Sequence, residues 1–543
     1  MFRFLAIALL AVLAASPRAA WAREEARTIV VLHDGGDEAS PLVYAAPVLK
    51  YLGLLVEPHS AADPLPDLAG RADVRGVLIW LDTGAVADRA GFTAWVRGAT
   101  QQGLPVALMG ATPDADDRFG LFLALDLLYA HDERAYTYDL RAVEKDTALI
   151  EAERRFDNLF PPVDIVRPLQ DAAVQPLLVL QRRSDVTDRT MPLIVTPKGA
   201  YAAAGYALWV SPDGKTQRWM VDPVAWFRLA FHLDAVPTPD LTTLNARRIL
   251  SLALAPSGPD DGPAAIAAGE HLMAGHPERS LDVLLDGPGN RGPVAPPRPC
   301  ADRARAHLMG YSHLLAQLDA GEAPRRIAGY TPVLLVCEAE SDLTAGAANA
   351  VLGHARTLPL ATSKISPEAL DIDFGAIRLD RIDTGVWRVL DRGALNTLRF
   401  DDADHLRIDW SRTEGVLGAG RVHGALYISL DPDAGEPVVA LTNMPWEPPP
   451  FATLVESRWM ISGLVRDVET AAMNVQGSGP GDMVWSVEPF SEWELTFKPK
   501  TGAPARYRAV AGFDGVLSFS LPASAGDGGT LTFERHDLAE VGP

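Results

Sequence analysis

Cysteine is scarce in this chain, whose 543 residues contain only Cys300 and Cys337. One pair of thiols cannot build the disulfide framework of a small secreted domain, and neither cysteine has the ligand spacing of a zinc site. Both lie in the same middle segment, so they either pair in an oxidising compartment or remain two buried thiols. Neither a metal nor a cofactor is predicted.

Long apolar runs are missing after the N-terminus. Arg3 precedes the apolar residues 4–15, and Ala20-Trp21-Ala22 has the small residues of a signal-peptidase site, which predicts a signal peptide over 1–22. The apolar run is shorter than the roughly 20 residues that cross a bilayer. We expect a periplasmic or secreted protein without a transmembrane span; retention of the run as an uncleaved anchor is the alternative.

Basic residues are fewer than acidic residues in this chain. The 49 Lys and Arg residues against 70 Asp and Glu residues give a formal net charge of −21. This surplus of negative charge argues against nucleic acid and anionic membrane surfaces as partners, and it suits a cationic partner.

The N-terminal part alternates apolar, β-branched runs with helical stretches. Apolar runs at 27–32, 74–81 and 105–109 are separated by helix-like segments at 42–52 and 90–102. This alternation predicts a parallel sheet covered by helices, a flavodoxin-like or amidotransferase-like α/β layer domain.

Shorter strand-like runs extend this domain to a proline-rich boundary. Pro237 and Pro239 cannot continue a regular element, so we place the α/β domain with its strand-rich extension at 23–240.

Ligands of parallel sheets bind at the carboxyl ends of the strands. Two acidic loops follow strands there and contain His33, Asp34, Asp37 and Asp82, which form a candidate ligand loop. Nearby carboxylates make these loops poor cradles for phosphate. The alternative is that the glycines of the first loop only permit a tight turn.

From residue 365 the chain changes to short alternating runs separated by Gly, Pro and Asp, which predicts a C-terminal antiparallel β-sandwich over 365–543. Sugar binding needs an exposed aromatic ring that can lie flat on a sugar. The candidates are Trp410, Trp446, Trp459, Trp485 and Trp493, each of which could instead be a core residue. Prolines around Trp446 predict that it is the most exposed of them.

Several segments occur in an order that matches one known family. They are APVLKYLGLLVEPHSAADPLPDLAGRADVRGVLIWLD, RWMVDPVAWFRLAF, VPTPDLTTLNARRIL, APRRIAGYTPVLLVCEAESDL, GVWRVLDRGALNTLRF and IDWSRTEGVLG. Together they resemble the Pel-type periplasmic exopolysaccharide deacetylase/hydrolase family. The resemblance implies a polysaccharide partner and a deacetylase-like segment between the two flanking domains.

That segment, 241–364, departs from the family pattern. Family members follow an Arg-Arg pair with a strand ending in Asp-Gly-Asp, whose carboxylates act as catalytic base and metal ligand. Here those positions are Ala255 and Ser257, and neither supplies an anionic oxygen. The segment is also shorter than the roughly 200 residues of a closed α/β barrel, so it is truncated and degenerate.

Other side chains in this segment are only weak candidates for metal ligands. His271 and His276 are five residues apart, which places them on different sides of a helix. Asp260 and Asp261 could be displaced metal ligands, although Asp beside Gly and Pro is ordinary loop chemistry.

The sequence therefore predicts a non-catalytic accessory or scaffold protein of Pel-like, biofilm-type exopolysaccharide modification or export. It would bind polysaccharide, a cationic amino-sugar polymer in particular, or proteins of the export machinery. One alternative is an active polysaccharide deacetylase, esterase or glycoside hydrolase whose catalytic residues carry no recognisable motif. Another is a nucleotide or small-molecule binding protein built on the α/β domain.

Overall fold

The computed structural model describes most of the chain between residues 23 and 536. The described ranges are 23–36, 39–135, 140–146, 149–150, 163–170, 173–185, 187–210, 217–233, 236–240, 243–249, 251–255, 282–283, 333–337, 360–361, 376–393, 395–422, 424–444, 451–477, 481–522 and 528–536. None of the helices in these ranges is long and apolar enough to cross a membrane.

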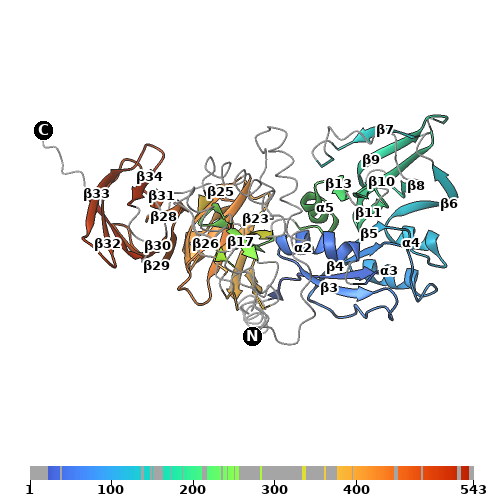
Figure 1. Ribbon diagram of the computed structural model, residues 1–543, viewed down its shortest axis with the longest axis horizontal. Helices are drawn as coiled ribbons and strands as arrows, with labels where there is room; N and C mark the ends of the chain where they lie inside the picture. The colour runs from blue at the N-terminus through green and yellow to red at the C-terminus, as the bar shows by residue number, and fades with distance from the viewer. Residues whose placement is uncertain are drawn as a thin grey trace, which may run out of the picture.

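An eight-stranded sheet forms the centre of the N-terminal α/β domain (Figure 1), in the order β3-β2-β4-β5-β11-β10-β9-β7. The strands are β2 (Thr28–His33), β3 (Leu55–Ser60), β4 (Val74–Leu81), β5 (Val106–Gly110), β7 (Leu140–Lys145), β9 (Gln175–Arg182), β10 (Arg189–Thr196) and β11 (Gly199–Ala203). The first five strands in this order are parallel, and β10, β9 and β7 follow antiparallel. The order of the first four is that of flavodoxin-like sheets.

The helices cover this sheet in pairs, α2 beside α5 and α3 beside α4 (Figure 1). Their bounds are η1 (Pro41–Ala45), α2 (Ala46–Tyr51), α3 (Phe92–Gln101), α4 (Arg118–Ala124) and α5 (Pro223–Ala230). α5 begins where the Asp222 carboxylate accepts hydrogen bonds from the amides of Val224 and Ala225, with Pro223 at the first helical position. Two ribbons complete the domain, β6 (Leu127–Ala135) with β8 (Val163–Pro168), and β12 (Leu208–Val210) with β13 (Gln217–Trp219).

Burial explains why the sequences of the central strands are continuously apolar. Every residue of β2 and all but one residue of β4 are buried. A parallel strand covered on both faces has no solvent side, so its sequence does not alternate.

Three antiparallel-rich sheets form the C-terminal half. The first has the order β1-β21-β22-β27-β24, the second β14-β23-β26-β25-β28-β31-β34 and the third β29-β30-β35-β32-β33. Their bounds are β1 (Arg23–Glu24), β14 (Thr238–Pro239), β21 (Arg378–Asp383), β22 (Val386–Leu390), β23 (Thr397–Phe400), β24 (Arg407–Ile408), β25 (Val416–Val422), β26 (Ala425–Leu430), β27 (Val438–Thr442), β28 (Thr453–Ser457), β29 (Met460–Arg466), β30 (Thr470–Gln476), β31 (Gly481–Ser486), β32 (Glu492–Pro499), β33 (Ala505–Val510), β34 (Val516–Leu521) and β35 (Gly529–His536).

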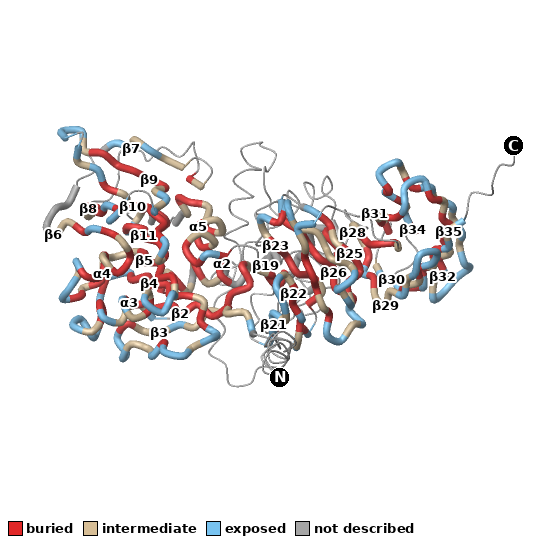
Figure 2. Tube along the Cα trace, turned by 180° about the vertical axis from the view of Figure 1, so that it is seen from behind, coloured by how far each residue is buried: buried red, intermediate tan, exposed pale blue. Residues whose placement is uncertain are grey.

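These sheets enclose two hydrophobic cores, visible as separate buried centres in Figure 2. The seven-stranded sheet runs through both sandwiches, because β25 pairs in parallel with β28 where Gly418 meets Leu454. The predicted combination of an α/β domain with a β-sandwich is confirmed in general terms. The structure has two sandwich cores where the sequence indicates one.

Parallel pairing is also found in the described part of the middle segment. β17 (Ser251–Ala255) lies between β18 (Asp282–Val283) and β19 (Val333–Cys337), parallel to both. Nearby, β16 (Arg247–Ile249) pairs antiparallel with β15 (Thr243–Leu244) and parallel with β20 (Leu360–Ala361).

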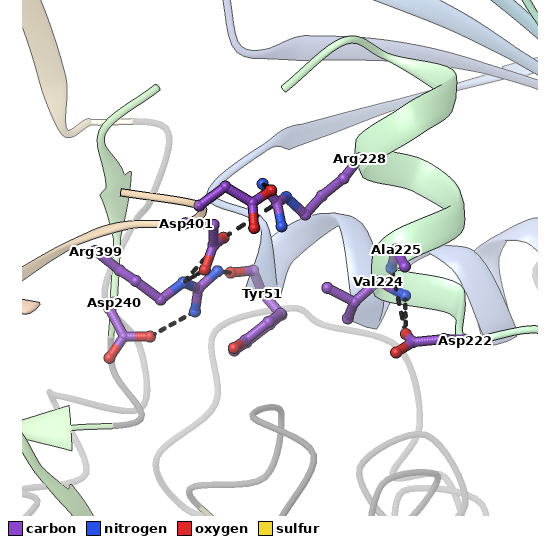
Figure 3. A network of polar contacts seen from close by, with 9 residues as sticks. Tyr51, Asp222, Val224, Ala225, Arg228, Asp240, Arg399 and Asp401 are labelled. Atoms are coloured by element: carbon purple, nitrogen blue, oxygen red, sulfur yellow. Dashed lines mark hydrogen bonds and ion pairs between the residues drawn. The ribbon is translucent and has the colours of Figure 1, made fainter. Parts of the chain in front are cut away.

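A buried arginine joins the α/β domain to the first sandwich (Figure 3). Arg399 of β23 donates from Nη1 to Asp240 Oδ1 over 2.8 Å and from Nη2 to the main-chain oxygen of Tyr51 over 3.1 Å, and its Nε lies 3.2 Å from Asp401. Its guanidinium also lies 3.9 Å from the centre of the Tyr51 ring. The Arg399 and Asp240 side chains are 0% and 1% exposed.

The charge of Arg399 is maintained despite this burial. Burial by itself lowers the pKa of Arg399, but Tyr51, Asp401 and Asp240 raise it, so the pKa lies above its ordinary value. A second arginine at the same junction, Arg228 of α5, pairs with Asp402 over 2.5 Å.

We predict that Asp240→Asn lowers the free energy of unfolding by about 3 kcal/mol, because it leaves a buried guanidinium without one of its carboxylates. The matched control is Asp402→Asn, which removes a 78% exposed partner of Arg228 and should cost less than about 1 kcal/mol. Urea unfolding followed by tryptophan fluorescence measures both. Equal losses in the two variants would contradict this account of the junction.

Candidate functional site

A pocket of about 500 Å³ opens at the carboxyl ends of β4, β5 and β11. The loops after β4 and β5 form one side, and β8 and β11 contribute the other. The lining residues are Thr83, Gly84, Ala85, Gly110, Ala111, Thr112, Asp114, Arg118, Val163, Asp164, Tyr201, Ala203 and Ala204. This is the edge of a parallel sheet where ligands are expected to bind.

Two glycines allow the loops after β4 and β5 to approach each other. Gly84 and Gly110 have φ of 84° and 80°, a region that side-chain-bearing residues rarely adopt. A Cβ on Gly84 would lie 2.6 Å from the Thr112 oxygen, and one on Gly110 would lie 2.3 Å from the Leu81 oxygen. The Asp114 amide donates to the Gly84 oxygen over 2.8 Å, which holds the two loops together.

Asp34, at the end of β2, holds the loop after β4 in place. Its carboxylate accepts hydrogen bonds from the amides of Asp82, Thr83 and Ala85 over 2.7, 2.8 and 3.1 Å, and from the Thr83 hydroxyl over 2.5 Å. Partial burial by itself raises the pKa of Asp34, but these hydrogen bonds outweigh it, so the pKa lies below its ordinary value. Asp34 therefore positions two residues of the pocket wall, Thr83 and Ala85.

The other members of the predicted ligand loop lie beside the pocket without lining it. His33 is 8% exposed, and its Nδ1 lies 2.7 Å from the Gly35 oxygen. Asp82 accepts a hydrogen bond from the Ser40 amide over 3.0 Å. Asp37 lies outside the described residues.

Sequence reasoning missed the polar wall of the pocket. Asp164 of β8 accepts a hydrogen bond from the Thr112 hydroxyl over 3.0 Å. Tyr201 of β11 is 2% exposed, and burial, followed by the nearby Asp164, raises its pKa, so the phenol is neutral. Thr112 follows the predicted strand at 105–109 and could have been found by the same carboxyl-end rule. No local sequence pattern predicts that Asp164 and Tyr201 lie beside Thr112.

A charged pair completes the wall. Arg118, at the start of α4, donates from Nη2 to Asp114 Oδ1 over 2.8 Å, and Arg89 lies 2.8 Å from the other Asp114 oxygen. Burial lowers the pKa of Arg118, but hydrogen bonds with Asp114 and Tyr129 raise it above its ordinary value.

The prediction that tryptophan rings form a sugar-binding surface is wrong for three of the five candidates. Trp459 and Trp485 are 0% exposed and Trp493 is 1% exposed, so these rings pack in the core of the second sandwich and cannot lie on a sugar. Trp410 is only partly exposed, with the Arg466 guanidinium 5.0 Å from its ring centre. Trp446 lies outside the described residues.

Arg466 explains why Trp410 is covered. Its guanidinium donates to the main-chain oxygens of Val416, Leu417 and Ala452 over 2.9–3.0 Å, linking the second sandwich to the first. Burial lowers the pKa of Arg466 to about 10. Trp410 is therefore part of the junction between the sandwiches.

The exposed aromatic rings of the second sandwich are phenylalanines. Phe490 and Phe513 are 64% and 79% exposed, and they lie in the loops after β31 and β33. The two loops are hydrogen-bonded to each other, from the Phe490 amide to the Gly512 oxygen over 3.3 Å and from the Ala511 amide to the Ser491 oxygen over 2.9 Å. Val510 and Val516, at the ends of the strands that flank the second loop, are 64% and 36% exposed. We call these four exposed apolar residues on and beside the two loops the aromatic rim.

Charged groups border the aromatic rim. Glu488 pairs with Arg535 over 2.5 Å, and Glu492 lies 3.6 Å from Arg508. Asp514 is exposed between Phe513 and Gly515 and accepts a hydrogen bond from the Val516 amide.

The predicted deacetylase positions are only partly described. Ala255 ends β17, where its backbone pairs with that of Cys337 in β19. Ser257, Asp260, Asp261, His271, His276 and Cys300 lie outside the described residues. Within the described ranges, no group of three or more His, Cys, Asp or Glu side chains is placed to hold a metal ion.

No family model and no curated protein sequence matches the chain. Among solved structures, it is similar to Agd3, a novel carbohydrate deacetylase, with 9% identity and a TM-score of 0.24. The match covers 48% of this chain and 42% of that chain, less than half the length of either. A likeness at this TM-score supports no conclusion about fold or activity.

We predict that Asp34→Asn destabilises the α/β domain by about 1–3 kcal/mol, because a neutral amide replaces a carboxylate that accepts four hydrogen bonds. The effect depends on pH. Because the folded-state pKa is depressed, the stabilisation is present above the unfolded value of about 3.9 and is lost as the pH falls through the folded value. Urea unfolding at pH 7 and at pH 3 should show a difference between wild type and variant that shrinks on acidification; a constant difference would contradict the assignment.

Proposed function

We propose that this chain is a non-catalytic accessory protein that binds an exopolysaccharide, with the aromatic rim as its contact surface. The proposal rests on two exposed phenylalanine rings, which lie on two loops that are hydrogen-bonded to each other. An aromatic face packs on the apolar CH groups of a pyranose ring, and bordering charged groups reach the hydroxyls. Phe490 and Phe513 provide the rings, and Glu488, Arg508 and Asp514 provide the polar neighbours.

The charge of the chain favours a cationic polymer. A net charge of −21 attracts a partly deacetylated amino-sugar polymer over long range. Such attraction is screened by salt, with a Debye length of about 8 Å at 0.15 M and 3 Å at 1 M. Binding should therefore have a salt-sensitive electrostatic component and a salt-resistant stacking component at the rim.

The resemblance to Pel-type proteins supports a place in exopolysaccharide modification or export, in the periplasm or outside the cell. Ala255 and Ser257 stand where that family carries carboxylates, which supports binding without turnover. Proteins of the export machinery belong to the same proposal as further partners.

We predict that Phe513→Ala and Phe490→Ala each weaken binding of a partly deacetylated amino-sugar polymer about five-fold, since each ring contributes about 1 kcal/mol. Chitosan immobilised on a sensor surface, with the full chain as analyte, measures the affinities at 0.15 M and 1 M salt.

The matched control is Leu169→Ala, which removes a 45% exposed apolar side chain from the α/β domain and should leave the affinity unchanged. Equal affinities for wild type and the Phe490→Ala/Phe513→Ala double variant would rule out the rim as the contact surface.

A further inference from the structure

The pocket of the α/β domain is separate from the aromatic rim. It lies at the edge of the eight-stranded sheet, whereas the rim lies on the second sandwich at the other end of the molecule (Figure 1). The lining of the pocket and the rim have no residue in common, so a ligand in the pocket is a second binding event with its own chemistry.

The size of the pocket fits a small polar ligand. A volume of about 500 Å³ lies within the roughly 300–1,000 Å³ of small-molecule sites, enough for one or two pyranose rings. Part of the loop side of the wall has small side chains, so a ligand can approach the backbone closely at Gly84, Ala85, Gly110 and Ala111.

One carboxylate of the lining suits a cationic ligand. The charged residues of the lining are Asp114, Asp164 and Arg118. Asp114 is already paired with Arg118 and Arg89, and Asp164 is the second carboxylate of the wall. Carboxylates disfavour phosphate and other anions, and they accept hydrogen bonds from an ammonium group. Asp164 is oriented for this role by the hydroxyl of Thr112, 3.0 Å away.

Hydroxyl groups in the lining favour a sugar over a simple amine. Thr83, Thr112 and Tyr201 each place a hydroxyl-bearing side chain in the wall. Tyr201 is 2% exposed and belongs to the lining of the pocket. Hydroxyl groups both donate and accept hydrogen bonds, so these side chains can bond to the hydroxyls of a sugar.

We propose that this pocket binds one hexosamine unit with a free amino group, with Asp164 accepting from the ammonium and Tyr201 bonded to a ring hydroxyl. The proposal rests on the proposed function only for the identity of the polymer that carries the unit. Acetylation of the amine removes the positive charge and adds bulk, so the pocket would distinguish deacetylated units from acetylated ones. The rim, by contrast, contacts ring faces that both kinds of unit share.

The test uses the full chain and three soluble probes: glucosamine, N-acetylglucosamine and glucose. Isothermal titration should show glucosamine binding at least ten-fold more tightly than either of the other two. Asp164→Asn should weaken glucosamine binding at least ten-fold, and Tyr201→Phe, which keeps the buried ring, should weaken it several-fold. The control Asp63→Asn changes an exposed carboxylate outside the lining and should have no effect.

Equal affinity for glucosamine and N-acetylglucosamine, no binding of any probe, or glucosamine binding unchanged in both pocket variants would overturn the proposal. These outcomes are distinguishable from failure of the proposed function. The Phe490→Ala/Phe513→Ala variant tests the rim on the polymer and should leave glucosamine binding unchanged. Retained glucosamine binding with no polymer binding would refute the rim alone.

Discussion

The ion pair between Arg399 and Asp240 sets the arrangement on which the rest of the molecule depends. Arg399 belongs to the first sandwich, whereas Tyr51 ends α2 of the α/β domain and Asp240 directly follows β14. A charge at 0% exposure is tolerated only with its partners in place. Short strands from both ends of the α/β domain, β1 and β14, pair with sandwich strands around it. Together these contacts join the domain that contains the pocket to the sandwiches.

A second arginine continues this connection to the aromatic rim. Arg466 bonds to oxygens of β25 and covers Trp410, while the Asp431 carboxylate of the first sandwich accepts hydrogen bonds from the Gly463 and Leu464 amides of the second over 2.8 Å each. The pocket and the rim therefore belong to one connected body. Two sites on one body can engage one polymer at two points, and the second contact then forms at high effective concentration. A selective pocket and a tolerant rim would together favour partly deacetylated polymer.

The outline of the fold could be predicted because its apolar runs are strong local signals. The apolar run at 74–81 forms β4 over Val74–Leu81. The acidic loop after β2 holds the loop after β4, which lines the pocket, but none of its own described residues lines it. The second sandwich core could not be predicted, because the pairing of β25 with β28 depends on contacts between segments with no local signature. For the same reason Asp164 and Tyr201 gave no signal. Alternation in a strand does not say which face is inward, so Trp485 and Trp493 could not be assigned to the core. A search for tryptophan also overlooked Phe490 and Phe513.

The central claim is that the chain holds an amino-sugar polymer without changing it. The most direct measurement is a proton NMR time course of a partly acetylated amino-sugar polymer with the full chain and added zinc. The account predicts that the polymer resonances broaden on binding while the acetyl signal keeps its intensity and no free acetate appears. Release of acetate, or sharpening of the resonances as the polymer is cut, would contradict it and show that the chain is an enzyme.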